Sequence, residues 1–168
     1  MSKAFTREDD AEELVVRPTV SSLPPGVKNY VTADGAQRLQ GELDRLIKVD
    51  RPAVASLPDP VEAKGQLQIL DQKIAQLSHS LQSAEIVPPP VEPEQVVRFG
   101  AFVTVRNRAG DETEYRIVGV DEMDIDRDWV SWRSPIARAL INARLGQRVR
   151  FRFPAGEDEL EIIGLHYG

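Results

Sequence analysis

The sequence predicts an α+β protein in which an antiparallel pair of helices precedes a small antiparallel sheet carrying one helix. Three observations predict this class. Apolar residues recur at helical spacing as far as about residue 85, a proline-rich stretch follows, and the apolar period then changes to the two-residue alternation of strands. We therefore divide the 168 residues into a disordered tail (1–29), a helical hairpin (30–87), a linker (88–95) and a C-terminal domain (96–168).

Composition limits what the protein can do. The formal net charge of −6 argues against autonomous binding to duplex nucleic acid, which requires a basic face. Cysteine is absent, which excludes disulfides, thiolate zinc sites and a cysteine nucleophile. Because no long apolar run exists and no signal peptide follows Met1, we expect a cytoplasmic protein with no membrane partner. We also expect a monomer without a cofactor.

The first 29 residues combine an acidic run with turn-forming prolines. The run Glu8-Asp9-Asp10 continues into Glu12-Glu13, and Pro24-Pro25 follows later. Such a segment buries too little apolar area to offset its ordering entropy, so we expect a disordered tail. It is either a passive extension or a second arm that contacts a partner.

Two helices are predicted to form the hairpin. Thr32 can cap the first helix, and Asp34 is favourable in its first turn, whereas Pro52 should kink or end it because the ring crowds the Lys48 carbonyl. The turn at residues 57–60 reverses the chain, and the second helix is predicted to run from about Val61 to Glu85. The apolar residues of the two helices recur at spacings of three and four, which is typical of a coiled coil: Ala36, Leu39, Leu43 and Leu46; then Leu67, Leu70, Ile74, Leu77, Leu81 and Ala84.

The C-terminal domain alternates strand patterns with turns. Strands are predicted at 102–106, 113–120, 129–132, 148–153 and 159–167, and a helix at 134–145 that Gly146 ends. The loop from Asp121 to Asp128 carries five acids. It lacks the glycine and final glutamate of an EF-hand, so we expect a solvated loop, with calcium binding as the alternative.

The helix after Ser134 is the most distinctive stretch of the chain. Ser134 can accept hydrogen bonds from the first turn, and Pro135 suits the first helical position. Ile136 then turns inward, whereas Arg138 points toward solvent or a partner. Taken alone, this pattern predicts one capped helix that packs on the domain.

The sequence motifs around this helix are similar to those of a known family. Tyr115-Arg116-Ile117-Val118-Gly119-Val120-Asp121-Glu122, followed by Ser134-Pro135-Ile136-Ala137-Arg138-Ala139-Leu140, resembles the C-terminal domain of the bacterial Gre transcription elongation factors. The resemblance extends more weakly through 49–54 and 84–87. It implies an FKBP-like C-terminal domain and a first helix that tolerates Pro52 and continues to about Ser56.

The resemblance also implies a partner and a binding site. In the family the hairpin enters the secondary channel of RNA polymerase, and the C-terminal domain docks on the channel rim. The matching positions predict a polymerase-binding site at Ser134, Pro135, Ile136 and Arg138. Arg133 differs, because some members carry an acid there.

The hairpin tip departs from the family. There, tip acids help polymerase hold a second magnesium ion and cleave the transcript, but only Asp59 and Glu62 occupy the tip here. The hairpin is shorter by about 15 residues, which withdraws the tip by roughly 10 Å, whereas magnesium ligands lie about 2 Å from the ion. This shortened hairpin resembles the branch named regulators of nucleoside diphosphate kinase.

We therefore expect an elongation factor with weak or no stimulation of transcript cleavage. The residues form no catalytic constellation, so we do not expect an enzyme. Three alternatives stay open: a full cleavage factor that uses the tip acids, an interaction module unrelated to transcription, and a prolyl isomerase with an aromatic-lined pocket.

Overall fold

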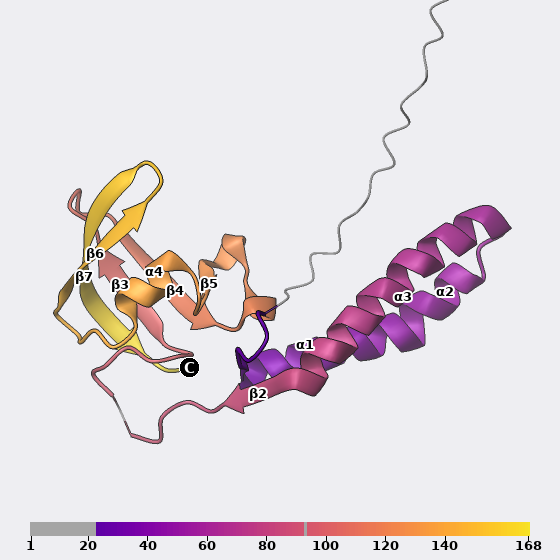
Figure 1. Ribbon diagram of the computed structural model, residues 1–168, viewed down its shortest axis with the longest axis horizontal. Coiled ribbons are helices and arrows are strands. Elements are labelled where there is room, and N and C mark those ends of the chain that lie inside the picture. The colour runs from indigo at the N-terminus through magenta and orange to yellow at the C-terminus, as the bar shows by residue number, and fades with distance from the viewer. Residues whose placement is uncertain (1–22, 93) are drawn as a thin grey trace, which may run out of the picture.

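The computed structural model describes residues 23–92 and 94–168, and within this range a helical arm projects from a sheet domain (Figure 1). The predicted tail lies outside the described residues as far as residue 22. The arm consists, in chain order, of β1 (Asn29–Thr32), α1 (Ala33–Arg45), the π-helical turn η1 (Leu46–Asp50), α2 (Arg51–Ala55), α3 (Pro60–Ser83) and β2 (Ala84–Val87).

The outgoing leg of the arm confirms the predicted helix start. Thr32 is the N-cap of α1, and its Oγ1 accepts a hydrogen bond of 3.0 Å from the Gly35 N–H. The leg continues past Pro52 to Ala55 through η1, whose wider turn has the Arg51 N–H donating to the Leu46 carbonyl. A π turn ahead of the proline relieves the crowding that an α turn would impose.

The returning leg, α3, runs back beside the outgoing leg (Figure 1). It ends at Ser83, so the prediction that it reaches Glu85 is wrong. Ala84 adopts an extended conformation, with φ −65° and ψ 130°, and starts β2. Packing in the arm is asymmetric: Leu39, Leu43 and Leu46 of the outgoing leg are buried, whereas the predicted inward residues of α3 are only half-buried.

A short parallel ladder closes the base of the arm. β1 pairs with β2 from Asn29 opposite Ala84 to Thr32 opposite Val87, although no strand was predicted at either place. The buried Asn29 side chain adds a second tie, because its Nδ2 donates to the Ser80 carbonyl at 3.0 Å. The two ends of the arm are therefore held at one point.

The sheet domain contains five strands in the order β5-β4-β3-β7-β6. Their bounds are Phe102–Arg106 (β3), Glu112–Val118 (β4), Trp129–Ser131 (β5), Arg148–Phe153 (β6) and Gly156–His166 (β7). The prediction of a purely antiparallel sheet is wrong, because β5 runs parallel to β4. The intervening 3₁₀ turns η2 (Val120–Glu122) and η3 (Ile125–Arg127) carry the chain back so that β5 starts in the same direction as β4.

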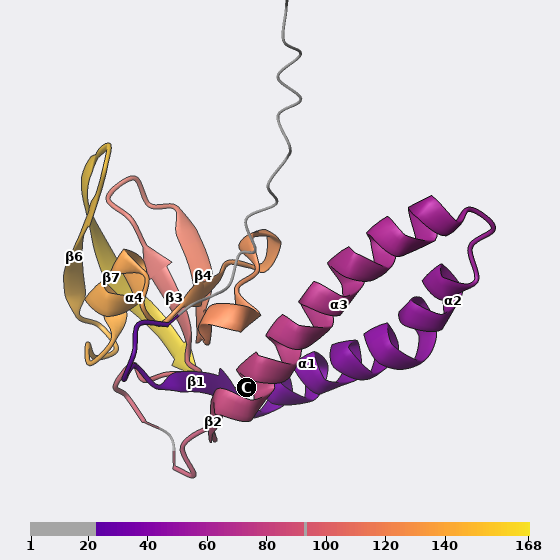
Figure 2. The ribbon, with the colours of Figure 1, turned by 45° about the vertical axis from the view of Figure 1, so that its right-hand side comes forward.

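One short helix, α4 (Pro135–Leu140), packs against β6 (Figure 2). Its Ala137 and Leu140 are fully buried in the core of the domain. The helix ends earlier than predicted, because Ile141 is extended and Asn142 adopts a positive φ of 70°. Among the described residues, no helix combines the length and apolarity needed to span a bilayer.

Candidate functional site

The predicted binding residues lie together on α4 and its N-cap, but they have different structural roles. Ser134 is the N-cap, since its Oγ accepts a hydrogen bond of 3.2 Å from the Ala137 N–H. Ile136 is half-buried against the core, whereas Pro135 and Arg138 are exposed. Pro135 and Arg138 are thus the most exposed of the four, and the role of all four in binding stays a prediction.

The structure adds two arginines that the resemblance did not indicate. Arg150 and Arg152 of β6 border the same hollow as Arg138 and Pro135, with a volume of about 400 Å³ and Phe151 in its wall. The signal in the sequence was the alternation Arg148-Val149-Arg150-Phe151-Arg152-Phe153, which places every second residue on one side of a strand. The hollow beside the predicted binding residues is therefore formed by α4 and β6 together.

The predicted tip acids lie at the start of α3, and their hydrogen bonds to other described residues are all local. Asp59 is the N-cap, and its carboxylate accepts from the Val61 N–H at 2.8 Å. Glu62 accepts from the Gln66 side chain at 2.9 Å. In the part of the chain that the structure describes, no three His, Cys, Asp or Glu residues gather so that they could hold a metal ion. Asp59 therefore has a structural role that the sequence argument did not assign to it.

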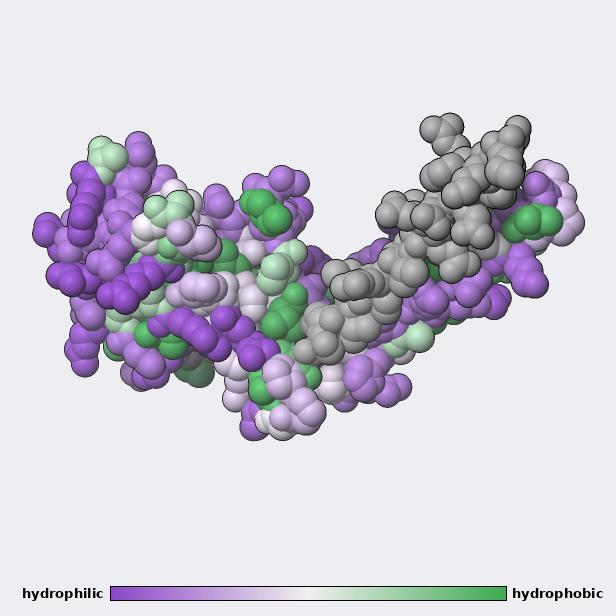
Figure 3. All heavy atoms as spheres, turned by 45° about the horizontal axis from the view of Figure 1, so that its top comes forward, coloured by the Kyte–Doolittle hydropathy of each residue, from purple (hydrophilic) through white to green (hydrophobic). Residues whose placement is uncertain are grey.

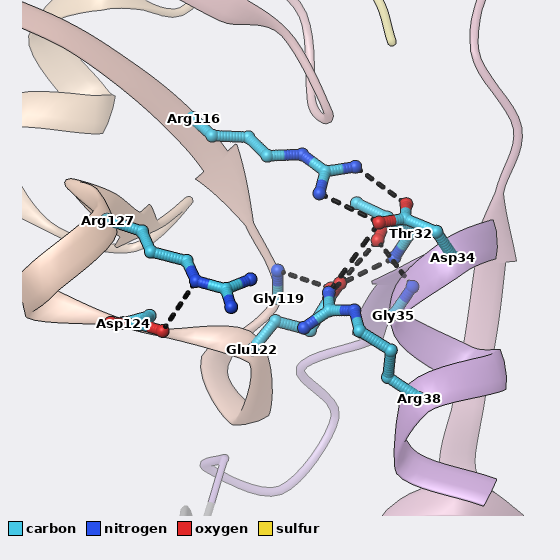
Figure 4. A network of polar contacts seen from close by, with 9 residues as sticks. All are labelled: Thr32, Asp34, Gly35, Arg38, Arg116, Gly119, Glu122, Asp124 and Arg127. Atoms are coloured by element: carbon cyan, nitrogen blue, oxygen red, sulfur yellow. Dashed lines mark hydrogen bonds and ion pairs between the residues drawn. The ribbon is translucent and has the colours of Figure 1, made fainter. Parts of the chain in front are cut away.

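A buried acid joins the arm to the sheet domain (Figure 4). Glu122, from η2, is 4% exposed and accepts hydrogen bonds of 2.9 Å from the Thr32 N–H and the Gly119 N–H. Its other oxygen accepts from the Thr32 hydroxyl. The prediction of a solvated loop is therefore wrong for Glu122, because this side chain satisfies backbone groups at the base of α1 that would otherwise be buried without partners.

Two glycines allow this carboxylate to approach so closely. A Cβ on Gly35 would lie 1.7 Å from Glu122 Oε1, and one on Gly119 would lie 2.3 Å from the Tyr30 carbonyl oxygen. Any other residue would force the Glu122 carboxylate to move at the first position and the Tyr30 backbone to move at the second. Thr32, Gly35, Gly119 and Glu122 thus form one unit, which we call the junction.

An ion pair extends the junction. The Arg116 guanidinium donates to both carboxylate oxygens of Asp34, at 2.6 and 2.8 Å. Its hydrogen bonds lower the pKa of Asp34 from 3.8 to about 2. The same guanidinium lies 4.7 Å from the centre of the Trp129 ring, and Arg38 of α1 lies 4.6 Å from it. These contacts fix the direction of the arm relative to the domain that carries α4.

Apolar side chains also reach the surface where the arm meets the sheet domain, and further apolar patches lie elsewhere, among them one at the end of the arm (Figure 3). Close by, Tyr30 of β1 packs edge-on against Trp132, with ring centres 5.3 Å apart, and lies 5.9 Å from Phe99. Polar and aromatic contacts therefore both hold the arm against the sheet domain.

Known proteins resemble this chain over most of its length. It is 34% identical over 154 residues to transcription elongation factor GreB of Neisseria meningitidis serogroup A, covering 83% of this chain and 94% of that protein. It is 37% identical over 152 residues to GreB of Pasteurella multocida, covering 83% and 96%. The chain belongs to the Gre family of transcription elongation factors. Residues 92–167 also match the family described as "Transcription elongation factor, GreA/GreB, C-term".

Solved Gre structures resemble the chain as well. GreA/GreB from Nitrosomonas europaea is 22% identical, covers 84% of this chain and 99% of that chain, and gives a TM-score of 0.41. GreA factor homolog 1 of Thermus thermophilus is 20% identical, covers 83% and 99%, and gives a TM-score of 0.40. The family indicated by the two motifs of the sheet domain is thus confirmed by the comparisons of sequence.

Proposed function

We propose that this Gre protein binds RNA polymerase at its secondary channel and modulates elongation, with weak or no stimulation of transcript cleavage. In this proposal the sheet domain is FKBP-like and docks on the channel rim, and the arm enters the channel. Membership of the Gre family supports the partner. The state of the tip acids is the observation that supports weak cleavage.

The two tip acids make local contacts, and their carboxylates do not converge on one point. Asp59 caps α3 and Glu62 lies three residues later in the first turn. One carboxylate is thus engaged with backbone N–H groups of its own helix, which leaves it less free to ligate a cation.

The lengths of the relatives also support a shortened arm. The Neisseria match extends over 154 aligned residues, but 83% of this 168-residue chain is only about 139 residues. About 15 of the aligned positions are therefore not matched by a residue of this chain. If the difference lies in the two legs, each loses about seven residues, or roughly 10 Å at 1.5 Å per residue. Since a magnesium ligand must lie about 2 Å from the ion, such a tip would not reach.

The test uses core RNA polymerase and a backtracked transcription complex. We expect the wild-type chain to bind the polymerase and to compete with a Gre factor that has a full acidic tip, so that transcript cleavage falls as this chain is added. The double variant Asp59→Asn, Glu62→Gln should compete equally well. These substitutions remove both charges, and asparagine keeps the cap of α3.

Two results would contradict the proposal. Efficient cleavage by the wild type that the double variant loses would identify the tip acids as ligands of the catalytic metal. Absence of binding to core polymerase at micromolar concentration would favour an interaction module unrelated to transcription.

A further inference from the structure

We propose that a groove along the arm is a self-association surface, on which the same groove of a second copy of this chain packs antiparallel. The groove runs between α2 and α3, with Ala55 and Leu57 on one side and a stripe of α3 on the other, and has a volume of about 1010 Å³. Small-molecule sites enclose roughly 300 to 1,000 Å³ and surround their ligand. This groove is open along the arm, so it suits the side chains of another helix. We call it the arm groove.

The packing of the arm leaves apolar surface exposed beside the arm groove. Ala63 is the one buried residue of α3, whereas Leu67, which lines the groove, is half-buried. Val61 is 81% exposed. It lies two helical turns before Gln68, another residue of the groove, so the two share one side of α3. A second helix laid along this side would remove the exposed apolar surface from water, which favours association.

The stripe of α3 in the arm groove is arranged so that it can pack on itself. Its eight residues run from Pro60 to Ala75 at alternating spacings of three and one, and therefore follow one side of the helix. The midpoint lies between Leu67 and Gln68. A two-fold axis through this midpoint makes the contact isologous, so that each residue meets the one equally far beyond the midpoint in the other copy.

Charge complementarity favours a second copy as the occupant. Lys64 and Asp71 are the two charged residues that line the arm groove, and they are equally far from the midpoint. Lys64 of each copy therefore lies opposite Asp71 of the other, which gives two ion pairs. The Asp71 carboxylate binds Arg51 at 2.8 Å but is 48% exposed, so it can accept a second cation. The other facing pairs bring no charges together: Pro60 with Ala75, Ala63 with Gln72, and Leu67 with Gln68.

The antiparallel register also keeps the sheet domains apart. The tip of each arm reaches the level of Ala75 in the other copy, and Ala75 lies eight residues before Ser83, the last residue of α3. At 1.5 Å per residue, about 12 Å of arm separates that tip from the base. The contact thus lies on the part of the arm that projects away from the sheet domain (Figure 1).

Self-association would hold the arm in reserve. In the proposed function one arm enters the polymerase channel, and a pair of arms is about twice as wide. The dimer and the polymerase-bound form would then be alternatives, and the monomer expected from the sequence would be the form present at low concentration. This consequence rests on the proposed function, whereas the pairing of the arms does not.

Sedimentation velocity of the full chain at about 1 to 500 µM tests the pairing without polymerase, since a contact this small should be weak. We expect the weight-average mass to rise from 18.7 kDa toward twice that value. Lys64→Glu and Asp71→Lys each set like charges opposite one another and should raise the dissociation constant of the dimer at least about tenfold. The control Lys73→Glu makes the same change of charge on α3, but Lys73 does not line the arm groove, so the constant should stay within about twofold. Circular dichroism verifies that each variant keeps the arm helical.

An equimolar mixture of the two single variants tests the register. In the mixed dimer the acid introduced at position 64 faces the lysine introduced at position 71, and the natural pair of Lys64 with Asp71 remains at the other end. The mixture should therefore dimerise within about threefold of the wild type. A wild-type mass of 18.7 kDa at every concentration would overturn the inference. Dimerisation that neither single variant weakens, or a mixture that stays monomeric, would overturn it as well. None of these results alters the proposed function, which the competition assay tests separately.

Discussion

The base and the tip of the arm are built in opposite ways. At the base, a carboxylate that is 4% exposed bonds to the backbone of Gly119 nearby and of Thr32, 90 residues away in the chain, and the close approach requires glycine at two positions. At the tip, two exposed carboxylates bond only to groups within four residues of themselves. We therefore expect the tip to tolerate substitution better than the base. Long-range contacts thus hold the direction of the arm, whereas no long-range contact holds the two carboxylates at its tip.

The largest effect should come from Gly35→Ala. Because the new Cβ would lie 1.7 Å from Glu122 Oε1, the carboxylate must move and leave the Thr32 and Gly119 N–H groups buried without an acceptor. We expect a loss of about 2 to 4 kcal/mol in the free energy of unfolding, measured in urea.

Gly41→Ala is the matched control in the same helix. A Cβ on Gly41 would meet no atom of the described residues within 4 Å, so the variant should gain about 0.5 to 1 kcal/mol from helix propensity. Equal effects of the two substitutions would show that the junction contributes little.

The second-largest loss of stability should come from a substitution in the packed interior of the arm. Leu43→Ala removes a side chain that is 9% exposed and should lower the free energy of unfolding of the arm by about 2 kcal/mol. Ile69→Ala, at a position 62% exposed, should change it by less than about 0.5 kcal/mol. Helicity followed by circular dichroism during heating measures both, and an unchanged melt of the Leu43 variant would contradict the burial of this leg.

A smaller and pH-dependent effect is expected for Arg116→Gln. The pKa of Asp34 is about 2 in the folded protein and 3.8 ordinarily, so its ionised form stabilises the fold above pH 4 and this stabilisation is lost as the pH falls through 2. The variant should lose about 1 kcal/mol at pH 7, because the Asp34 carboxylate is half exposed and screened by solvent.

The same variant should return the pKa of Asp34 toward 3.8, which NMR titration of the carboxyl carbon measures. Its stability should then depend less on pH between 4 and 2 than that of the wild type. A pKa of Asp34 that remains near 2 would assign the shift to groups other than Arg116.

The smallest effect is expected at the tip. Glu62→Gln keeps the hydrogen-bonding reach of the side chain and removes only an exposed charge from the first turn of α3. It should lower the free energy of unfolding by less than about 0.5 kcal/mol. A loss above 1 kcal/mol would mean that the tip is as specified as the base.

Local patterns in the sequence predicted the elements well. Caps at Thr32 and Ser134, a proline in the first turn of α4, and strict alternation in β3 and β6 are signals that lie within a few residues of the structure they determine. The four α4 residues could also be placed on one helix by the same reasoning.

Long-range contacts were the part that could not be predicted. In the sequence, Glu122 is one of several acids in a charged loop, and only the fold brings it to Thr32. Gly35 is, in the sequence, a residue of low helix propensity within a helix. A glycine in the first turn of a helix, where it lowers helix propensity, was the available signal of a close approach. The pairing of β1 with β2 and the arginines of β6 beside Arg138 likewise depend on how distant segments meet.

The parallel ladder between β1 and β2 has a consequence for how such arms vary in length. Because Asn29 is held against Ala84 and Thr32 against Val87, the arm is a loop whose ends are already closed at its base. Closing a loop costs about 0.6 kcal/mol more for each doubling of its length, so removing equal turns from both legs changes this entropy very little. Shortening or lengthening both legs equally should therefore leave the domain that supports the arm undisturbed.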